Sequence, residues 1–263
     1  MDFRRAKFLL PNLFTLTSIG AGLYSIHLST QAQSPSQMML AAWVLVVSMV
    51  CDAFDGRVAR MTRTESELGI QLDSLADSIS FGVAPAFLLF HWGLESWGVA
   101  GMAVAFVYVA CAVLRLARFN VLSARGEGVE SKKYFVGLPT PLAAGAVVAV
   151  VLAHLSYAEV ATSGAAQMVA VVTVVLAVLM VSNVRYRTFK DVNLEGGAVA
   201  VAGLVVVTSV GASIVFKPYV TFVLLMVAYI GLGILGGILE LGKTLVGDGE
   251  SEESYLAEAG DGQ

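Results

Sequence analysis

Four aspartates stand in two pairs at helical spacing, within sequence that is otherwise largely apolar. Asp52 and Asp55 are three residues apart, and Asp73 and Asp77 are four residues apart. On a helix, residues with these spacings share one face, so each pair presents both carboxylates to the same side. Carboxylates at membrane depth are costly to bury and commonly mark a functional site. The two pairs therefore predict an active site rather than a structural feature.

If the two pairs face each other, four negative charges meet, and bound divalent cations would balance them. Oxygen ligands favour Mg²⁺ or Mn²⁺, and we expect two such ions per site. Two hard cations suit phosphoryl transfer, because they polarise the phosphorus and stabilise the leaving oxygen. Gly56 and Ala59 leave room for a bulky ligand beside the helix, and Arg60 offers a cation to phosphate oxygens.

The chain that carries these residues has the composition of an integral membrane protein. Hydrophobic residues make up 57% of it and charged residues 14%, with a mean hydropathy of +0.78. We predict an all-α, polytopic helical bundle of about eight transmembrane helices. The expected spans are 10–28, 38–56, 70–91, 97–117, 139–157, 166–184, 196–216 and 218–240.

The basic residues predict how this bundle sits in the membrane. Of the 16 lysines and arginines, only Lys217 falls on the opposite side from the others when the eight spans are threaded in turn. By the positive-inside rule, the basic side is cytoplasmic, and an even number of spans puts both termini there. The second span reaches Asp55 near its cytoplasmic end and the third begins near Gly69, so all four aspartates are expected at the cytoplasmic face.

The cysteines, the histidines and the C-terminal segment do not indicate a further site. Cys51 and Cys111 lie in apolar stretches and suggest neither a disulfide nor a zinc site, and the three histidines never pair at ligand spacing. Residues 243–263 are acidic and are expected to form a disordered cytoplasmic tail. No soluble second domain is expected.

The aspartates belong to a longer pattern, Asp-x2-Asp-Gly-x2-Ala-Arg-x8-Gly-x3-Asp-x3-Asp. All its fixed positions are matched, by Asp52, Asp55, Gly56, Ala59, Arg60, Gly69, Asp73 and Asp77. This pattern resembles the signature of the CDP-alcohol phosphatidyltransferase family. The resemblance implies a six-helix core in which a CDP-linked lipid reacts with an alcohol at the cytoplasmic face and CMP is displaced.

The resemblance also implies roles for individual residues. Asp52, Asp55 and Asp73 resemble the metal ligands, while Asp77 resembles the catalytic general base that also approaches the second metal. A carboxylate beside a metal suits this role, because an alcohol is a poor nucleophile near neutral pH. The residues expected to bind the CDP-lipid are Asn12, Thr15, Gly56, Ala59, Arg60, Ser66 and Gly69.

A second segment bears on the alcohol. Residues 115–120 (Arg-Leu-Ala-Arg-Phe-Asn), residues 133–141 and the Pro-Asn-Leu-Phe-Thr run at 11–15 resemble the phosphatidylserine synthase branch of the family. That branch transfers the phosphatidyl group of CDP-diacylglycerol to the hydroxyl of L-serine. Since the serine carboxylate needs a cation near the metals, the expected serine-binding residues are Arg115, Arg118, Asn120 and Lys133.

The resemblance divides the chain into a catalytic core at 1–190, two additional transmembrane helices at 191–242 and the tail at 243–263. It implies location in the inner (cytoplasmic) membrane and contact with membrane lipids. We expect a homodimer and no nucleic-acid partner.

Other functions stay open on the sequence alone. A transferase of the same family could use another acceptor, such as glycerol 3-phosphate or inositol phosphate, but a phosphorylated acceptor should require more cations near the site. A membrane prenyltransferase should show a second aspartate cluster after Asp77, which is not found. An ion transporter would place its carboxylates near the membrane midplane and along a path.

Overall fold

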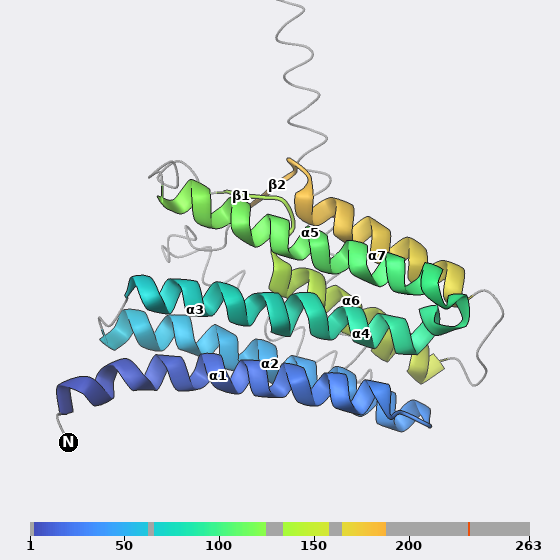
Figure 1. Ribbon diagram of the computed structural model, residues 1–263, viewed down its shortest axis with the longest axis horizontal. Helices are drawn as coiled ribbons and strands as arrows, with labels where there is room; N and C mark the ends of the chain where they lie inside the picture. The colour runs from blue at the N-terminus through green and yellow to red at the C-terminus, as the bar shows by residue number, and fades with distance from the viewer. Residues whose placement is uncertain (1–2, 63–65, 125–133, 158–164, 188–230, 232–263) are drawn as a thin grey trace, which may run out of the picture.

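A computed structural model describes residues 3–62, 66–124, 134–157, 165–187 and 231 (Figure 1). Over these residues the chain makes six long helical passes. They are α1 (Phe3–Thr30), α2 (Pro35–Thr62), a continuous third helix, α5 (Val99–Ala124), α6 (Thr140–Tyr157) and α7 (Ala165–Val181). The third helix comprises α3 (Glu67–Asp77), η1 (Ser78–Val83), α4 (Ala84–Leu89), η2 (Phe90–Leu94) and η3 (Glu95–Trp97).

Each of the first six predicted spans coincides with one of these passes. Among the described residues, three helical stretches are long and apolar enough to cross a membrane, namely Pro35–Ala59, Glu67–Trp97 and Val99–Ala124. The apolar stretches Thr140–Ser156 and Ala166–Val181 are shorter. The described residues are thus those of a helical membrane protein. The predicted spans 196–216 and 218–240 and the tail at 243–263 lie outside the described residues.

The helices extend beyond the predicted spans at several ends. The second span was expected to end at residue 56, whereas α2 continues to Thr62 and carries Arg57 and Arg60 on its last turns. Hydropathy detects only the apolar middle of such a helix, because polar residues can continue it into the interfacial region.

One pair of short strands adds to the all-helical prediction. β1 (Tyr134–Val136) and β2 (Arg185–Arg187) are antiparallel, with Phe135 opposite Tyr186. After β1 the chain turns at Gly137, whose φ of 79° favours glycine and whose Cα lies against the Met180 carbonyl with no room for a side chain. The strand pair ties the start of α6 to the end of α7.

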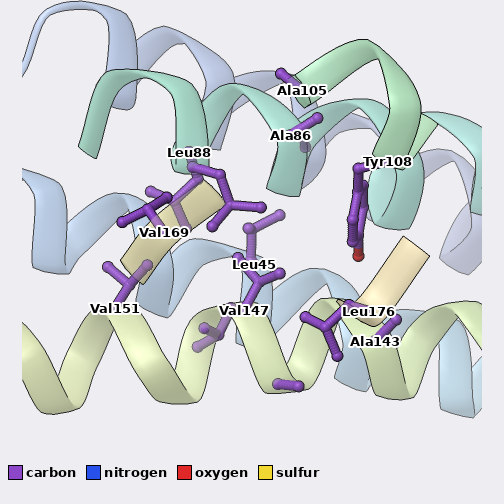
Figure 2. Packing of buried hydrophobic residues seen from close by; sticks show 14 of the residues in the cluster. Leu45, Ala86, Leu88, Ala105, Tyr108, Ala143, Val147, Val151, Val169 and Leu176 are labelled. Atoms are coloured by element: carbon purple, nitrogen blue, oxygen red, sulfur yellow. The ribbon is translucent and has the colours of Figure 1, made fainter. Parts of the chain in front are cut away.

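The helices pack into a bundle with α6 on the inside. α1 runs along α2, α5 packs on α7, and α6 contacts α2, η1 and α4 (Figure 1). Buried side chains from five helices meet at α6, among them Leu45, Leu88, Tyr108, Val147 and Val169 (Figure 2). Half of the 18 α6 residues are Ala or Val, and the residues from Ala143 to Ala149 are all buried, so the middle of this helix is packed against its neighbours.

The third helix departs from regular α geometry immediately after Asp77. Its turn at η1 is π-helical, and the Tyr108 hydroxyl from α5 donates to the Phe81 carbonyl in that turn at 3.4 Å. π-Turns occur frequently at functional sites, because they change the direction of side chains along a helix. Here the turn separates the aspartates of α3 from the core contacts of α4.

Candidate active site

The four aspartates meet between the last turns of α2 and the second half of α3. A single carboxylate oxygen from each of Asp52, Asp55 and Asp73 lies within 4.8 Å of the other two. Asp55 is 5% exposed. Three oxygen ligands at this separation could hold one hard divalent cation. The structure thus brings the two pairs face to face, as their spacing suggested.

Asp77 completes the group from one turn further along α3. Its carboxyl lies within hydrogen-bonding reach of the Asp52 carboxyl. One buried oxygen of each of these two side chains has no hydrogen-bond partner among the described residues. Buried carboxylate oxygens without partners are costly, and a cation would satisfy them. The donor set therefore fits divalent metal ions.

A threonine from the first helix holds one of these carboxylates. The Thr15 hydroxyl on α1 donates to Asp55 Oδ2 at 2.8 Å, and both side chains are buried. Thr15 was expected to contact the CDP-lipid, whereas here it orients a candidate metal ligand, as residues behind a metal site commonly do. Asn12 lies three residues before Thr15 on α1 and is half-buried.

The other residues expected at the CDP-lipid lie on α2 and at the start of α3. A side chain built at Gly56 would meet no atom of the described residues within 4 Å, so that among them open space adjoins α2 beside Asp55. Ala59 and Arg60 follow on the next turn of the same helix. The Ser66 hydroxyl caps α3 by accepting from the Gly69 N–H at 3.1 Å, which is a structural role.

The open space at Gly56 permits a test of ligand approach. If the CDP-lipid binds here as expected, Gly56→Leu should leave the fold intact but raise the KM for that lipid, since overlap with a ligand costs about 1 to 3 kcal/mol, or roughly fivefold to a hundredfold. Gly20→Leu is a matched control on α1, where a side chain also meets no atom of the described part of the chain within 4 Å. If both variants showed the same KM, Gly56 would not adjoin the nucleotide.

One of the predicted serine-binding residues acts electrostatically on the aspartates. Arg115 on α5 is 8% exposed, and its charge acts on the Asp77 carboxyl. Its Nη1 donates to the Thr140 hydroxyl at the start of α6 at 3.3 Å, and its guanidinium lies 5.7 Å from the centre of the Phe119 ring. Arg115 is thus a buried cation whose charge acts on the acidic cluster.

Asn120 and Arg118 have other neighbours. Asn120 exchanges hydrogen bonds with the hydroxyl of Ser74, which follows Asp73 on α3, with distances of 2.9 and 3.2 Å. Arg118 is directed toward the end of α7, where Nη2 donates to Asn183 Oδ1 at 2.9 Å and Nη1 to the Val181 carbonyl at 3.5 Å. Lys133 lies outside the described residues.

The histidines and cysteines do not join this site. His91 pairs with Glu95 at 3.3 Å, and His154 packs edge-on against Trp92, at the other end of the bundle. Cys51 and Cys111 are free thiols, in agreement with the expectation of no disulfide.

Comparison with known proteins identifies the family. The model of the CDP-alcohol phosphatidyltransferase family matches residues 8–182, which contain all four aspartates and most of the described helices. The chain belongs to the CDP-alcohol phosphatidyltransferase family. CDP-alcohol phosphatidyltransferases generally use divalent metal ions, in agreement with the acidic cluster. This membership decides against the ion transporter and the prenyltransferase.

Three relatives of the chain share one name. A protein named CDP-diacylglycerol–serine O-phosphatidyltransferase from Helicobacter pylori strain 26695 is 41% identical to this chain, over 70% of this chain and 74% of its own length. The protein of that name from Helicobacter pylori strain J99 is 36% identical, over 93% of this chain and 97% of its own length. A protein of that name from Mycobacterium tuberculosis is 33% identical over 84% of this chain and 75% of its own.

Proposed function

We propose that the protein is a phosphatidylserine synthase, which transfers the phosphatidyl group from CDP-diacylglycerol to the hydroxyl of L-serine and releases CMP. The observation that carries the chemistry is the meeting of Asp52, Asp55 and Asp73 within 4.8 Å, beside a fourth carboxylate. Serine as acceptor is supported by the names of the relatives and by the resemblance in residues 115–141.

Asp77 is the proposed general base. The serine hydroxyl loses its proton to the Asp77 carboxylate while its oxygen forms a bond to the phosphorus of the phosphatidyl group. The bond from that phosphorus to the oxygen it shares with CMP breaks, and CMP leaves with the bonding electrons. Bound Mg²⁺ or Mn²⁺ ions, two per site, would neutralise the phosphate oxygens and make the phosphorus more electrophilic.

The two substrates would approach the aspartates from different helices. The CDP-lipid side would comprise Asn12, Thr15, Gly56, Ala59, Arg60, Ser66 and Gly69, with the open space at Gly56 leaving room for the nucleotide. The serine side would comprise Arg115, Arg118, Asn120 and Lys133. Of the described serine-side residues, Arg115 is buried and acts on Asp77, so we assign it the serine carboxylate.

This assignment predicts a selective effect on serine. Arg115→Gln should raise the KM for serine about tenfold to a hundredfold, because a charge-assisted hydrogen bond in a partly desolvated site contributes about 1.5 to 3 kcal/mol. The KM for CDP-diacylglycerol should change far less. Arg118→Gln should have a smaller effect, since Arg118 is hydrogen-bonded to Asn183.

Serinamide, which lacks the carboxylate, provides the control for this prediction. It should be a poor acceptor for the parent enzyme and should lose little further activity in Arg115→Gln. An unchanged serine KM in that variant would remove Arg115 from the serine site.

We further propose that eight spans place the active site and both termini on the cytoplasmic side of the inner membrane. The distribution of basic residues supports this orientation. The core would end near residue 190, followed by two helices at 191–242 and the tail, and the working unit would be a homodimer. Accessibility of introduced cysteines in intact cells and cross-linking in the membrane test these statements.

The proposed activity is tested by measuring CMP release from CDP-diacylglycerol by the purified protein with Mg²⁺ or Mn²⁺. Serine, glycerol 3-phosphate, inositol phosphate and inositol are offered in parallel. Serine should support the fastest release, with phosphatidylserine as product. Faster release with another alcohol would keep the reaction type and overturn the choice of acceptor.

A further inference from the structure

Three buried serines lie beneath the aspartates, and neither the proposed mechanism nor the family motif uses them. Ser18 on α1, Ser48 on α2 and Ser80 in η1 form the serine cluster, and each is 0% exposed. Ser18 Oγ lies 2.9 Å from Ser48 Oγ and donates to Ser80 Oγ at 3.3 Å. Ser48 Oγ also lies 2.9 Å from the Ser18 carbonyl oxygen, to which it can donate. Three helical elements are therefore joined at one point.

The serine cluster repeats the arrangement of the acidic residues about one turn deeper in the bundle. Ser48 precedes Asp52 by four residues on α2, and Ser80 follows Asp77 by three on the third helix. Because these helices are antiparallel, both serines lie on the same side of the acidic pair, toward the interior. Ser18 follows Thr15, the partner of Asp55, by three residues on α1. The three helices that carry the aspartates and Thr15 thus contribute one serine each.

Close packing reinforces this junction. A side chain at Gly22, one turn beyond Ser18, would lie 3.1 Å from the Ser80 backbone, so α1 and η1 touch there. In an apolar environment, interhelical hydroxyl bonds hold neighbouring helices in one register, since an unpaired hydroxyl is costly there. Asp52 and Asp77 sit on different helices, so a shift of one helix would change the separation of their carboxyls.

We propose that Ser18, Ser48 and Ser80 are positioning residues. They hold α2 and the third helix in the relative register and rotation that allow the aspartates of the two helices to bind metal ions together. This inference rests on the proposed metal site. According to this inference, part of the metal affinity depends on residues outside the aspartate motif. These residues act through the packing of the helices and contact neither metal nor substrate.

The test is Mn²⁺ binding to the purified protein in the absence of both substrates, followed by the loss of the free-ion signal in electron paramagnetic resonance. Ser18→Ala and Ser48→Ala should each raise the Kd for Mn²⁺ about threefold to tenfold, the equivalent of one net hydrogen bond. In turnover, both variants should require more metal for half-maximal CMP release and should recover most of kcat at saturating metal.

Ser25→Ala is the matched control. Ser25 is also buried on α1 and donates to the Ala41 carbonyl on α2 at 2.8 Å, but it lies two turns further from the aspartates than Ser18. Ser25→Ala removes a comparable interhelical hydrogen bond, so it should lower thermal stability as much as Ser18→Ala does. The Kd for Mn²⁺ should stay within about twofold of the parent value. If Ser48→Ala does not fold, Ser80→Ala takes its place, because the Ser80 bond is the longest of the cluster at 3.3 Å.

The outcomes separate this inference from the proposed function. If the parent binds Mn²⁺ and the Kd is unchanged in the serine variants, or rises equally in Ser25→Ala, the positioning role is wrong and the proposed function stands. If the parent itself binds no Mn²⁺, the proposed metal site is wrong, and the positioning role falls with it.

Discussion

Asp52→Asn and Asp73→Asn should each reduce CMP release about a thousandfold or more. Each change removes a negative ligand from the group of three oxygens that lie within 4.8 Å of one another. A metal ion contributes several kcal/mol of charge stabilisation in the transition state, and each 1.36 kcal/mol corresponds to a factor of ten in rate. The measurement is single-turnover CMP release at saturating CDP-diacylglycerol and serine.

Chelation and stability provide the controls for this result. EDTA should abolish CMP release by the parent, and added Mg²⁺ or Mn²⁺ should restore it. The asparagine variants should fold and melt at or above the temperature of the parent without metal, because they relieve repulsion among buried carboxylates. Near-normal turnover of either variant at saturating metal would contradict the two-metal site.

Asp77→Asn should have the second largest effect, a loss of about a hundredfold to ten-thousandfold in turnover, which is the usual contribution of a general base. Binding of CDP-diacylglycerol should change much less, because the proton is transferred only in the reaction step. Asparagine preserves the shape of the side chain beside Asp52 but accepts no proton at neutral pH.

Lipid binding to this variant is measured by equilibrium binding of CDP-diacylglycerol, and turnover by CMP release at saturating serine. Glu67→Gln is a suitable control, since it removes a carboxylate from the exposed first turn of the same helix. A parallel loss of lipid affinity and turnover in Asp77→Asn would make Asp77 a metal ligand without a role as base.

The sequence predicted the helices well and their internal geometry poorly. Runs of apolar residues identify a helix in a membrane because every backbone group must be hydrogen-bonded within it. The same reasoning cannot detect the π-turn at Ser78–Val83, because hydropathy is insensitive to one extra residue in a turn. Nor did it detect β1 and β2, whose three-residue strands are too short for an alternating pattern.

The spacing of the aspartates was sufficient to predict that they lie close together, whereas the residues that hold them in place could not be predicted. The two pairs were expected to face each other, and they do. The bond from Thr15 to Asp55 depends on how α1 packs against α2, which the sequence of either helix alone does not determine. A signal did exist, since Thr15, Ser18, Gly22 and Ser25 recur at three- and four-residue intervals and mark one small, polar face of α1.

The π-turn after Asp77 limits which changes in length this protein can accept. An α-helix turns about 100° per residue, so a single deletion within Ser78–Val83 that restored regular α geometry would rotate one part of the helix against the other by about that angle. Either the aspartates of α3 would turn away from α2, or Leu88 and Leu89 would leave the core. The interval between Asp77 and these leucines is therefore expected to be free of gaps when this chain is aligned with enzymes that share its active site.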